Sequence, residues 1–323
     1  MKAIRFHKNG GPEVLQLEEI PVPEIQPDEV LIRVNAAGVN YIDIYQRNGL
    51  YKTELPYVPG TEGAGVVEKI GSNVTALRPG TRVAWGQHPG AFAEYAAIPA
   101  WKVVPLPDDV DDRNGAAILL QGMTAQYLCE TTYPAKAGDI ALVHAGAGGT
   151  GLLLIQMLKN KKVIVYTTVS TPEKAAIAKA AGADEAILYT QTDFAEAARK
   201  LTDGKGVNVV YDSVGKATYE GSLNALRPLG MLVLYGNASG PVPPIDPLVL
   251  TQKGSLFLTR PSLAHHVADA ASFAARSTRV LNWIATKELK LRIEHIYPLA
   301  DVAQAQRDIE SRKTTGKLVI DVR

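Results

Sequence analysis

Cysteine is almost absent from the sequence. Cys129 is the single cysteine among 323 residues, so no intramolecular disulfide can form. A zinc lobe built on four closely spaced cysteines is excluded for the same reason. The composition suits a reducing compartment, where thiols stay reduced.

Long apolar runs are also missing. The longest near a predicted helix, LLLIQML at 152–158, is far too short to cross a bilayer core about 30 Å thick. The first residues, MKAIRFHKNGG, contain no apolar stretch of the kind that a secretory signal carries. We therefore expect a soluble, cytoplasmic protein with no membrane partner.

Neither sign of charge dominates. With 34 Lys and Arg against 33 Asp and Glu, the formal net charge is +1, so no global field attracts nucleic acid or an anionic membrane. The histidines form no cluster with the spacing of metal ligands, and no metal site is expected. They are His7, His88, His144, His265, His266 and His295.

The sequence is long and apolar enough for two packed cores, since 46% of its 323 residues are hydrophobic. Residues 1 to about 121 are rich in short β runs, and EVLIRVNAAGV at 29–39 alternates as a half-buried strand does. After about 263 the pattern is helical, apart from a terminal strand KLVIDV at 317–322. That strand needs a partner sheet, which could belong to the first domain.

Between these parts, strands and helices alternate, which predicts a parallel sheet covered by helices on both faces. Right-handed crossovers then give a doubly wound α/β fold. The helix at 171–182 has Thr171 as N-cap, Pro172 at its first position and Gly182 past its end. The predicted strands are 140–146, 162–169, 185–189, 207–215, 231–240 and 254–262, and the other helices are 150–160 and those near 193–202 and 216–227.

The strongest local motif is HAGAGGTG at 144–151, in which Gly146, Gly148 and Gly151 match G-x-G-x-x-G. It follows a predicted strand and opens a predicted helix. Glycines let the backbone turn sharply and approach a pyrophosphate, and the helix N-terminus offers free N–H donors. The motif predicts a dinucleotide site; a tight turn without a ligand is the alternative.

The segment VYTTVSTPEK at 165–174 bears on the choice of dinucleotide. An NAD site usually carries an acid at the end of this strand, and none stands there. Thr168, Ser170 and Lys174 could instead bind a 2′-phosphate, and Tyr189 could help by its position. This favours NADP, although Lys174 could also be a solvated helix lysine and Tyr189 a core aromatic.

Several motifs together resemble the zinc-independent quinone oxidoreductases of the medium-chain dehydrogenase/reductase superfamily. They are the glycine motif, GVNYIDIYQRNGLY, PYVPGTEGAGVV, VYDSVG, YGNASG and LTRPSL. Zinc-dependent members of the superfamily carry a Cys where Asn40 lies and a His where Thr61 lies. The resemblance covers nearly the whole chain.

The resemblance implies a Rossmann domain at 122–262, inserted in a mostly β, GroES-like catalytic domain formed by 1–121 and 263–323. It also implies a homodimer with NADPH in the cleft between the two domains. Matched residue by residue, the cofactor contacts fall on Tyr41, Asp43, Tyr45, Thr124, Gly148, Gly149, Thr150, Thr168, Ser170, Lys174, Tyr189, Ser213, Asn237, Phe257, Leu258, Thr259 and Lys317. Among these, Lys317 is expected at the phosphate end.

Without a metal, the acceptor must already be electrophilic, as a quinone or an activated enone is. The protein then places the acceptor against the nicotinamide and excludes water. Tyr45 and Tyr41 are candidate proton donors, Asn40 could bind a carbonyl oxygen, and Arg260 could hold the acceptor. Packing roles for both tyrosines, a surface ion pair for Arg260 and protonation by solvent remain alternatives.

The predicted function is therefore NADPH-dependent quinone reduction. Reduction of activated enones or enoyl thioesters is the first alternative, and an NADPH-responsive RNA-binding protein is an alternative of another class. The absence of a stripe of Arg and Lys with aromatics counts against nucleic acid as a partner. An edge strand within GSLFLTR at 254–260 gives a homodimer a physical basis.

Overall fold

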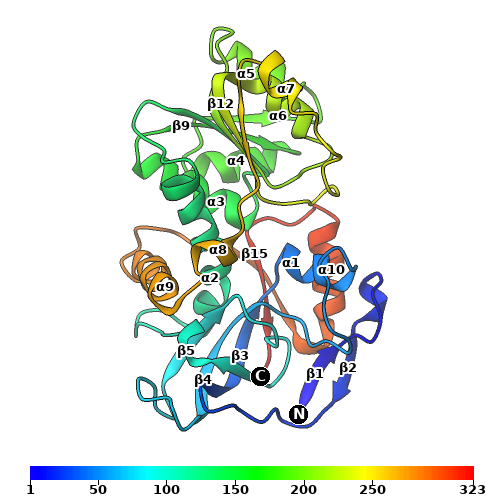
Figure 1. Cartoon of the computed structure of the whole chain (residues 1–323), viewed down its shortest axis with the longest axis vertical. Helices are drawn as coiled ribbons and strands as arrows, with labels where there is room; N and C mark the ends of the chain where they lie inside the picture. The colour runs from blue at the N-terminus through cyan, green and yellow to red at the C-terminus, as the bar shows by residue number, and fades with distance from the viewer. The chain divides into compact units, whose positions relative to one another are not determined.

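The computed structural model describes residues 1–323 as two compact units. Unit 1 comprises Met1–Met123 and His266–Arg323, and unit 2 comprises Thr124–His265. Both ends of the chain, blue and red in Figure 1, belong to unit 1, so unit 2 is inserted in it. The predicted fold class is confirmed. The expected division fell after residues 121 and 262.

Unit 2 contains a six-stranded sheet in the order β10-β9-β8-β11-β12-β13, and every neighbouring pair is parallel. The chain moves outward from β8 to β10, returns to the middle at β11 and moves outward again. The order therefore reverses between β8 and β11, which is where sheets of this kind bind dinucleotides. The strands are β8 (Ile140–His144), β9 (Ile164–Val169), β10 (Glu185–Leu188), β11 (Val207–Asp212), β12 (Leu226–Leu234) and β13 (Phe257–Thr259).

The four predicted helices of unit 2 are present, and the short helix at Leu248–Gln252 was not predicted. The N-cap of α4 is confirmed, because Thr171 Oγ1 accepts a hydrogen bond from the Lys174 N–H at 3.3 Å. Gly182, past the end of α4, has a φ of +109°, which favours glycine. The helices are α3 (Gly149–Asn160), α4 (Pro172–Ala180), α5 (Phe194–Lys200), α6 (Tyr219–Ala225) and α7 (Leu248–Gln252), with α8 (Leu263–His266) at the unit's end.

β12 differs most from the prediction, since the strand expected at 231–240 ends at Leu234 and begins earlier. The helix expected near 216–227 ends at Ala225, and β12 begins at Leu226 instead of residue 231. Leu226 pairs with Val207 of β11, and the register then shifts before Val209. This irregular pairing extends β12 through Pro228 and Gly230, two residue types that normally indicate a turn.

Unit 1 is built on a larger, mostly antiparallel sheet in the order β14-β15-β3-β4-β5-β7, with β6 also paired to β3. The terminal strand β15 lies between β14 and β3, which answers the question of its partner. A separate ribbon joins β1 and β2. The strands are β1 (Lys2–Arg5), β2 (Gln16–Glu19), β3 (Glu29–Gly38), β4 (Glu62–Ile70), β5 (Arg82–Gly86), β6 (Tyr95–Pro99), β7 (Val103–Pro105), β14 (Ile293–Pro298) and β15 (Lys317–Asp321).

The helices of unit 1 include two that the sequence pattern did not predict. These are α1 (Tyr41–Arg47), which is short, and α2 (Asp112–Tyr127), which crosses the unit boundary. The other elements are α9 (Ala270–Ala285), α10 (Val302–Glu310), the 3₁₀ turns Pro12–Val14, Ala100–Lys102 and Leu299–Asp301, and the π turn Leu128–Thr132. No helix has both the length and the apolar character that crossing a bilayer requires.

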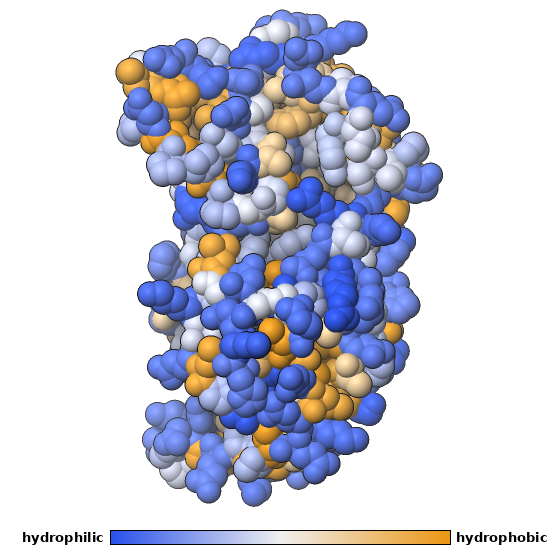
Figure 2. Space-filling view, turned by 90° about the vertical axis from the view of Figure 1, so that its right-hand side faces the viewer, coloured by the Kyte–Doolittle hydropathy of each residue, from blue (hydrophilic) through white to orange (hydrophobic).

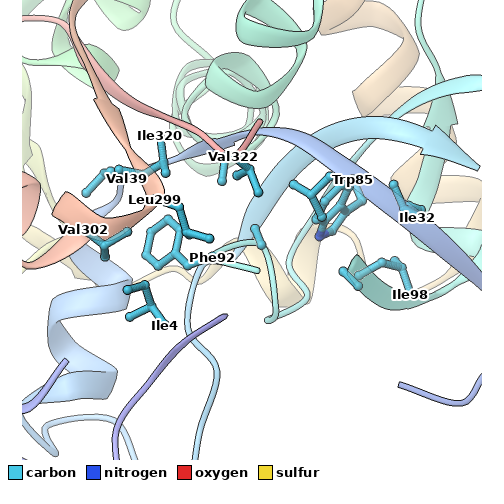
Figure 3. Close-up of a cluster of buried hydrophobic side chains, with 14 of the residues drawn as sticks. Ile4, Ile32, Val39, Trp85, Phe92, Ile98, Leu299, Val302, Ile320 and Val322 are labelled. Carbon is cyan, nitrogen blue, oxygen red and sulfur yellow. The ribbon is translucent and has the colours of Figure 1, made fainter. Parts of the chain in front are cut away.

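Buried aromatic rings hold unit 1 together. In Figure 3, Phe92 lies among Ile4 from the N-terminal strand and Leu299 and Val302 from the C-terminal part of the chain, and all are buried. Burying each such side chain contributes about 1.5–3 kcal/mol. The face in Figure 2 is mostly hydrophilic, with apolar residues gathered in separate patches.

Candidate functional site

The glycine turn between β8 and α3 has the form that dinucleotide binding requires. Gly148 is the N-cap of α3, and its N–H donates to the carbonyl of Ala145 at 2.9 Å. A Cβ on Gly151 would lie 2.9 Å from the Cα of Gly146, so the backbone segments touch. The first N–H groups of α3 have no acceptor within the helix, and the helix dipole adds positive potential there. Gly148, Gly149 and Thr150, which were predicted to contact the pyrophosphate, form this helix N-terminus, where an anion is favoured.

Other predicted residues lie at the same edge of the unit 2 sheet. The carboxyl ends of parallel strands share one edge, and a predicted residue follows four of them directly or closely. They are Ser170 after β9, Tyr189 after β10, Ser213 after β11 and Asn237 after β12. Thr259 ends β13, and Thr124 is the first residue of unit 2, on α2.

Three polar side chains are grouped by the ends of β9 and β10. Ser170 and Lys174 are half-buried, Lys174 in the first turn of α4, and Tyr189 is 44% exposed. The exposure of Tyr189 excludes the core role that was its alternative. This group offers hydroxyls and a cation, with no acid at the end of β9.

Thr168 does not have the predicted position. It is buried, and its Oγ1 bonds to Nδ1 of His144 at 2.8 Å in the interior of unit 2. Successive side chains of a strand point to opposite faces, so the neighbours of Thr168 in the sequence gave no reliable guide to its direction. A contact between its hydroxyl and a 2′-phosphate is contradicted.

The residues predicted on β13 differ among themselves. Phe257 begins the strand and is 55% exposed, away from the carboxyl end. Leu258 packs against the hydrophobic cluster of unit 2, so its side chain serves the core. Only Thr259 lies at the functional edge.

Arg260 and Asn237 lie together. With the Asn237 amide oriented so that its oxygen faces Arg260, it accepts from Nη2 at 3.1 Å and donates to the Gly236 carbonyl at 3.0 Å. Arg260 Nη1 also donates to the carbonyl of Leu234 at 3.2 Å. The guanidinium thus links the ends of β12 and β13.

In unit 1, Asn40 of the motif GVNYIDIYQRNGLY, Glu62 of PYVPGTEGAGVV and Lys317 form a buried polar cluster. Lys317 Nζ donates to Asn40 Oδ1 at 2.7 Å and forms an ion pair with Glu62. Asn40 Nδ2 donates to Glu62 Oε1 at 2.8 Å and to the Gly38 carbonyl at 3.2 Å. Glu62 Oε2 accepts from the Leu120 N–H at 2.8 Å.

This cluster corrects two predictions. Lys317 is fully buried and paired with Glu62, so it does not extend to a cofactor phosphate. Asn40 uses its amide oxygen and nitrogen within the cluster, so neither is available for an acceptor carbonyl. Both residues have the role of fixing the start of α1.

Asp43 also has an interior role in place of the predicted cofactor contact. It is fully buried, and its carboxylate accepts from the Asn40 N–H at 2.9 Å and from Thr61 Oγ1 at 3.0 Å. Burial raises the pKa of Asp43 to about 7, and these hydrogen bonds and Lys317 oppose the rise. Asp43 anchors the first turn of α1 by accepting a hydrogen bond from the N–H of Asn40, the N-cap residue.

The residues at the zinc position do not fit a zinc ion. Asn40 and Thr61 stand where zinc-dependent members carry Cys and His, and both are bonded within the cluster. The ammonium of Lys317 beside Asn40 would repel a dication. No group of three or more His, Cys, Asp or Glu side chains is placed to hold a metal.

The tyrosines of this region form a row of rings. The centroids of Tyr41 and Tyr45 are 6.0 Å apart, and those of Tyr45 and Tyr51 are 5.3 Å apart with edge-on geometry. The Tyr41 hydroxyl donates to the carbonyl of Ile309 at 3.0 Å, so its proton is engaged in that bond. Tyr45, which is 7% exposed, remains the candidate.

Sequence reasoning missed a second buried cluster, in unit 2. His144, Asp212 and Ser222 are buried and joined by hydrogen bonds. The signal was present, because His144 directly precedes the glycine motif and Asp212 lies within VYDSVG. Their contact depends on residues distant in the sequence.

Comparisons with known proteins agree with this geometry. Residues 26–108 match the family model "Alcohol dehydrogenase GroES-like domain", and residues 181–320 match "Zinc-binding dehydrogenase". The chain is 43% identical over 321 residues to a quinone oxidoreductase of Pseudomonas aeruginosa, covering 99% of each chain. It is 40% identical over 323 residues to a 2-haloacrylate reductase of Burkholderia sp, covering 98% of this chain and 97% of the other.

A solved structure shows the same fold. The Escherichia coli quinone oxidoreductase complexed with NADPH has a TM-score of 0.97 to this protein at 39% identity, with both chains covered fully. Relatives this similar over the full length share the family as well as the fold. The chain therefore belongs to the quinone oxidoreductase family of the medium-chain dehydrogenase/reductase superfamily and is an oxidoreductase.

Proposed function

We propose that the protein reduces quinones with NADPH and without a metal. The observation that carries the proposal is the carboxyl edge of the unit 2 sheet, where a glycine turn and helix N-terminus lie in the same row as Ser170, Lys174 and Tyr189. The names of the relatives, and the NADPH bound to the Escherichia coli structure, support the same chemistry.

In this proposal different residues bind different parts of the cofactor. The N–H groups of Gly149 and Thr150 bind the pyrophosphate, since they begin α3. Ser170 and Lys174 bind the 2′-phosphate, which an acid at this position would repel. Ser213 and Asn237 lie at the same edge of the sheet, after β11 and β12.

NADPH, when bound, supplies the hydride, and the quinone then needs a proton to become a hydroquinone. We assign that proton to the Tyr45 hydroxyl, because the hydroxyl of Tyr41 is bonded to a carbonyl. The buried cluster under α1 fixes the helix from which Tyr45 projects. Transfer of single electrons is the alternative for a quinone acceptor.

A direct assay tests the proposal. Loss of absorbance of reduced nicotinamide is followed with 1,4-benzoquinone and 9,10-phenanthrenequinone, using NADPH and NADH in parallel. We expect turnover with NADPH and a KM for NADH at least tenfold higher, because NADH lacks the phosphate that binds Lys174. Absence of turnover with every quinone would contradict the proposal.

A matched pair of variants tests the role of Lys174. Lys174→Met is expected to raise the KM for NADPH about tenfold and to leave the KM for NADH unchanged, since one charge-assisted contact is lost. Lys205→Met, which removes an exposed lysine of the same unit, is the control. Equal effects of Lys174→Met on both cofactors would remove the 2′-phosphate contact from the proposal.

The second candidate function is reduction of activated enones. The 40% identity to a 2-haloacrylate reductase favours it, because both substrate classes accept hydride at an electrophilic centre. Turnover of 2-chloroacrylate or a 2-alkenal in the same assay, with no turnover of quinones, would select this function.

We also propose a homodimer. β13 is the edge strand of the unit 2 sheet, and Phe257 on it is 55% exposed. An unpaired edge with an exposed aromatic ring favours pairing with a second copy.

A further inference from the structure

A chain of buried polar groups joins the carboxyl ends of three neighbouring strands in unit 2. His144 ends β8, Asp212 ends β11, and Thr168 lies one residue before the end of β9. His144 Nδ1 lies 2.8 Å from Thr168 Oγ1, and its Nε2 lies 3.0 Å from Ser222 Oγ on α6. Ser222 Oγ in turn donates to Asp212 Oδ2 at 2.8 Å. All four residues are at most 2% exposed.

The donor and acceptor of each hydrogen bond among these buried side chains can be assigned, starting from Asp212. The Asp212 carboxylate accepts from Ser222, from Thr218 Oγ1 at 2.8 Å, and from the N–H groups of Val214 at 2.8 Å and Gly215 at 3.0 Å. With four donors directed at it, the Asp212 carboxylate acts as an acceptor in each of these hydrogen bonds. The single hydroxyl proton of Ser222 therefore lies in its hydrogen bond to Asp212.

The protonation of His144 follows from that assignment. Because Ser222 Oγ has no second proton, His144 Nε2 must carry the hydrogen in the bond between them. Burial lowers the pKa of His144 and outweighs the nearby Asp212 charge, so the ring is neutral and Nδ1 accepts from Thr168. The ring of Phe194 packs edge-on against His144 at 4.7 Å and helps to exclude water.

These buried side chains adjoin the glycine turn and the 213–215 turn, where the cofactor is proposed to bind. His144 immediately precedes the glycine turn, and the Gly146 N–H donates to the carbonyl of Thr168 at 3.3 Å. Asp212 fixes the turn after β11, in which Gly215 has a φ of +88°. β8 and β11 are the two strands between which the strand order reverses.

We propose that His144 is a positioning residue for the dinucleotide site, acting as a neutral ring protonated on Nε2 that holds the ends of β9, β8 and β11 in one fixed arrangement. This inference rests on the proposed function, since it assumes that NADPH binds at this edge. His144 acts through the glycine turn and the 213–215 turn and touches no cofactor atom itself.

Two measurements test the proposal. Nitrogen NMR of protein labelled in histidine should show that the ring whose signals disappear in His144→Gln is protonated on Nε2 and does not titrate between pH 5 and 8. A charged ring, or a proton on Nδ1, would overturn the inference. This result requires no cofactor, so it is independent of the proposed function.

The second measurement is direct NADPH binding by fluorescence titration, together with thermal unfolding. Ser222→Ala and His144→Phe are expected to raise the NADPH Kd about tenfold, and His144→Gln, which keeps an N–H for Ser222, about threefold, since each breaks or weakens a buried hydrogen bond. Ser277→Ala is the matched control, because Ser277 is equally buried in unit 1 and donates to the Phe273 carbonyl at 2.7 Å. It should lower the Tm without changing the Kd.

Wild-type Kd values in all variants with lowered Tm would overturn the positioning role while leaving the proposed function intact. No NADPH binding by the wild-type protein would instead overturn the proposed function and this inference together. If Ser222→Ala does not fold, His144→Gln and the NMR result still decide the matter.

Discussion

At the scale of single residues, Asp43 shows how burial changes a charge. Its pKa is raised from 3.8 to about 7, chiefly because a fully buried carboxylate loses its hydration. Between these two pH values the folded protein keeps a proton that the unfolded chain has released. Each bound proton of difference changes the free energy of unfolding by about 1.4 kcal/mol per pH unit. Asp43 therefore contributes a fall in the stability of unit 1 as the pH rises through this window. Burial lowers the pKa of His88 in the same unit from 6.5 to about 4, so His88 contributes an opposing rise up to about pH 6.5.

Asp43→Asn should remove the fall that Asp43 contributes. The neutral amide cannot ionise, so only the opposite contribution of His88 remains. The free energy of unfolding should then rise from pH 4.5 to about 6.5, although it starts lower because one hydrogen bond is lost. Urea unfolding followed by tryptophan fluorescence measures it, since the three tryptophans, Trp85, Trp101 and Trp283, all lie in unit 1. Asp108→Asn, an exposed site, should retain the wild-type slope. An unchanged slope in Asp43→Asn would assign the pH dependence to another group.

Tyr45→Phe separates proton donation from packing. The phenylalanine keeps the ring contacts with Tyr41 and Tyr51 and loses only the hydroxyl. Loss of a general acid is expected to lower kcat for quinones on the order of 100-fold. Tyr51→Phe, a variant of the neighbouring ring, should keep kcat within about twofold of wild type by the same reasoning. Full turnover in Tyr45→Phe would leave packing as the only role of Tyr45.

At the scale of elements, the buried ion pair joins β15 to β4 and the start of α1. Lys317→Met leaves Glu62 buried without its cation, which should cost about 3–5 kcal/mol. Lys317→Met with Glu62→Gln removes both charges and should recover most of that loss. The tryptophan-monitored unfolding described above measures both.

An exposed ion pair between two neighbouring strands of the same sheet is the control. Arg33 on β3 and Glu68 on β4 are 47% and 46% exposed, so Arg33→Met should cost less than about 1 kcal/mol. Equal losses in Lys317→Met and Arg33→Met would show that burial of the pair contributes nothing.

The elements also show what could be predicted from sequence. Thr171 and Gly182 bound α4 as predicted, because capping depends on residues a few positions apart. α2 was missed, since residues 1 to about 121 were interpreted as short β runs and turns. Its Gly122 allows close packing against Val280 of α9. The strands of unit 2 were found because each is a continuous apolar run.

The site was predicted less well than the fold, for a physical reason. The glycine turn and the row of residues after the strands follow from local sequence and parallel topology. The errors at Lys317 and Asn40 concern contacts between residues remote from one another in the chain, such as Lys317 with Glu62. The error at Asp43 is partly local, because the spacing of Asn40 and Asp43 is that of a capping box. Spacing within a motif contains no information on such partners.

At the scale of the whole molecule, the proposed dimer gives a prediction of its own. Phe257→Lys places a charge on the exposed edge strand β13 and should shift sedimentation at micromolar concentration from dimer to monomer. Leu229→Lys is the control, because Leu229 is 60% exposed in the same unit but lies on β12, which is not the edge. A wild-type protein that sediments as a monomer would contradict the proposed dimer.

The place of β15 between β14 and β3 has a consequence for how the protein forms on the ribosome. β15 follows unit 2 in the chain, so β3 and β4 are synthesised long before the strand and the lysine that complete their sheet. Until then Glu62 has no cation, and its carboxylate must remain hydrated. Unit 2, whose residues are continuous in the chain, has all its partners earlier. The domain that begins first is thus the last to close, and its early strands are the part of the nascent chain most in need of protection.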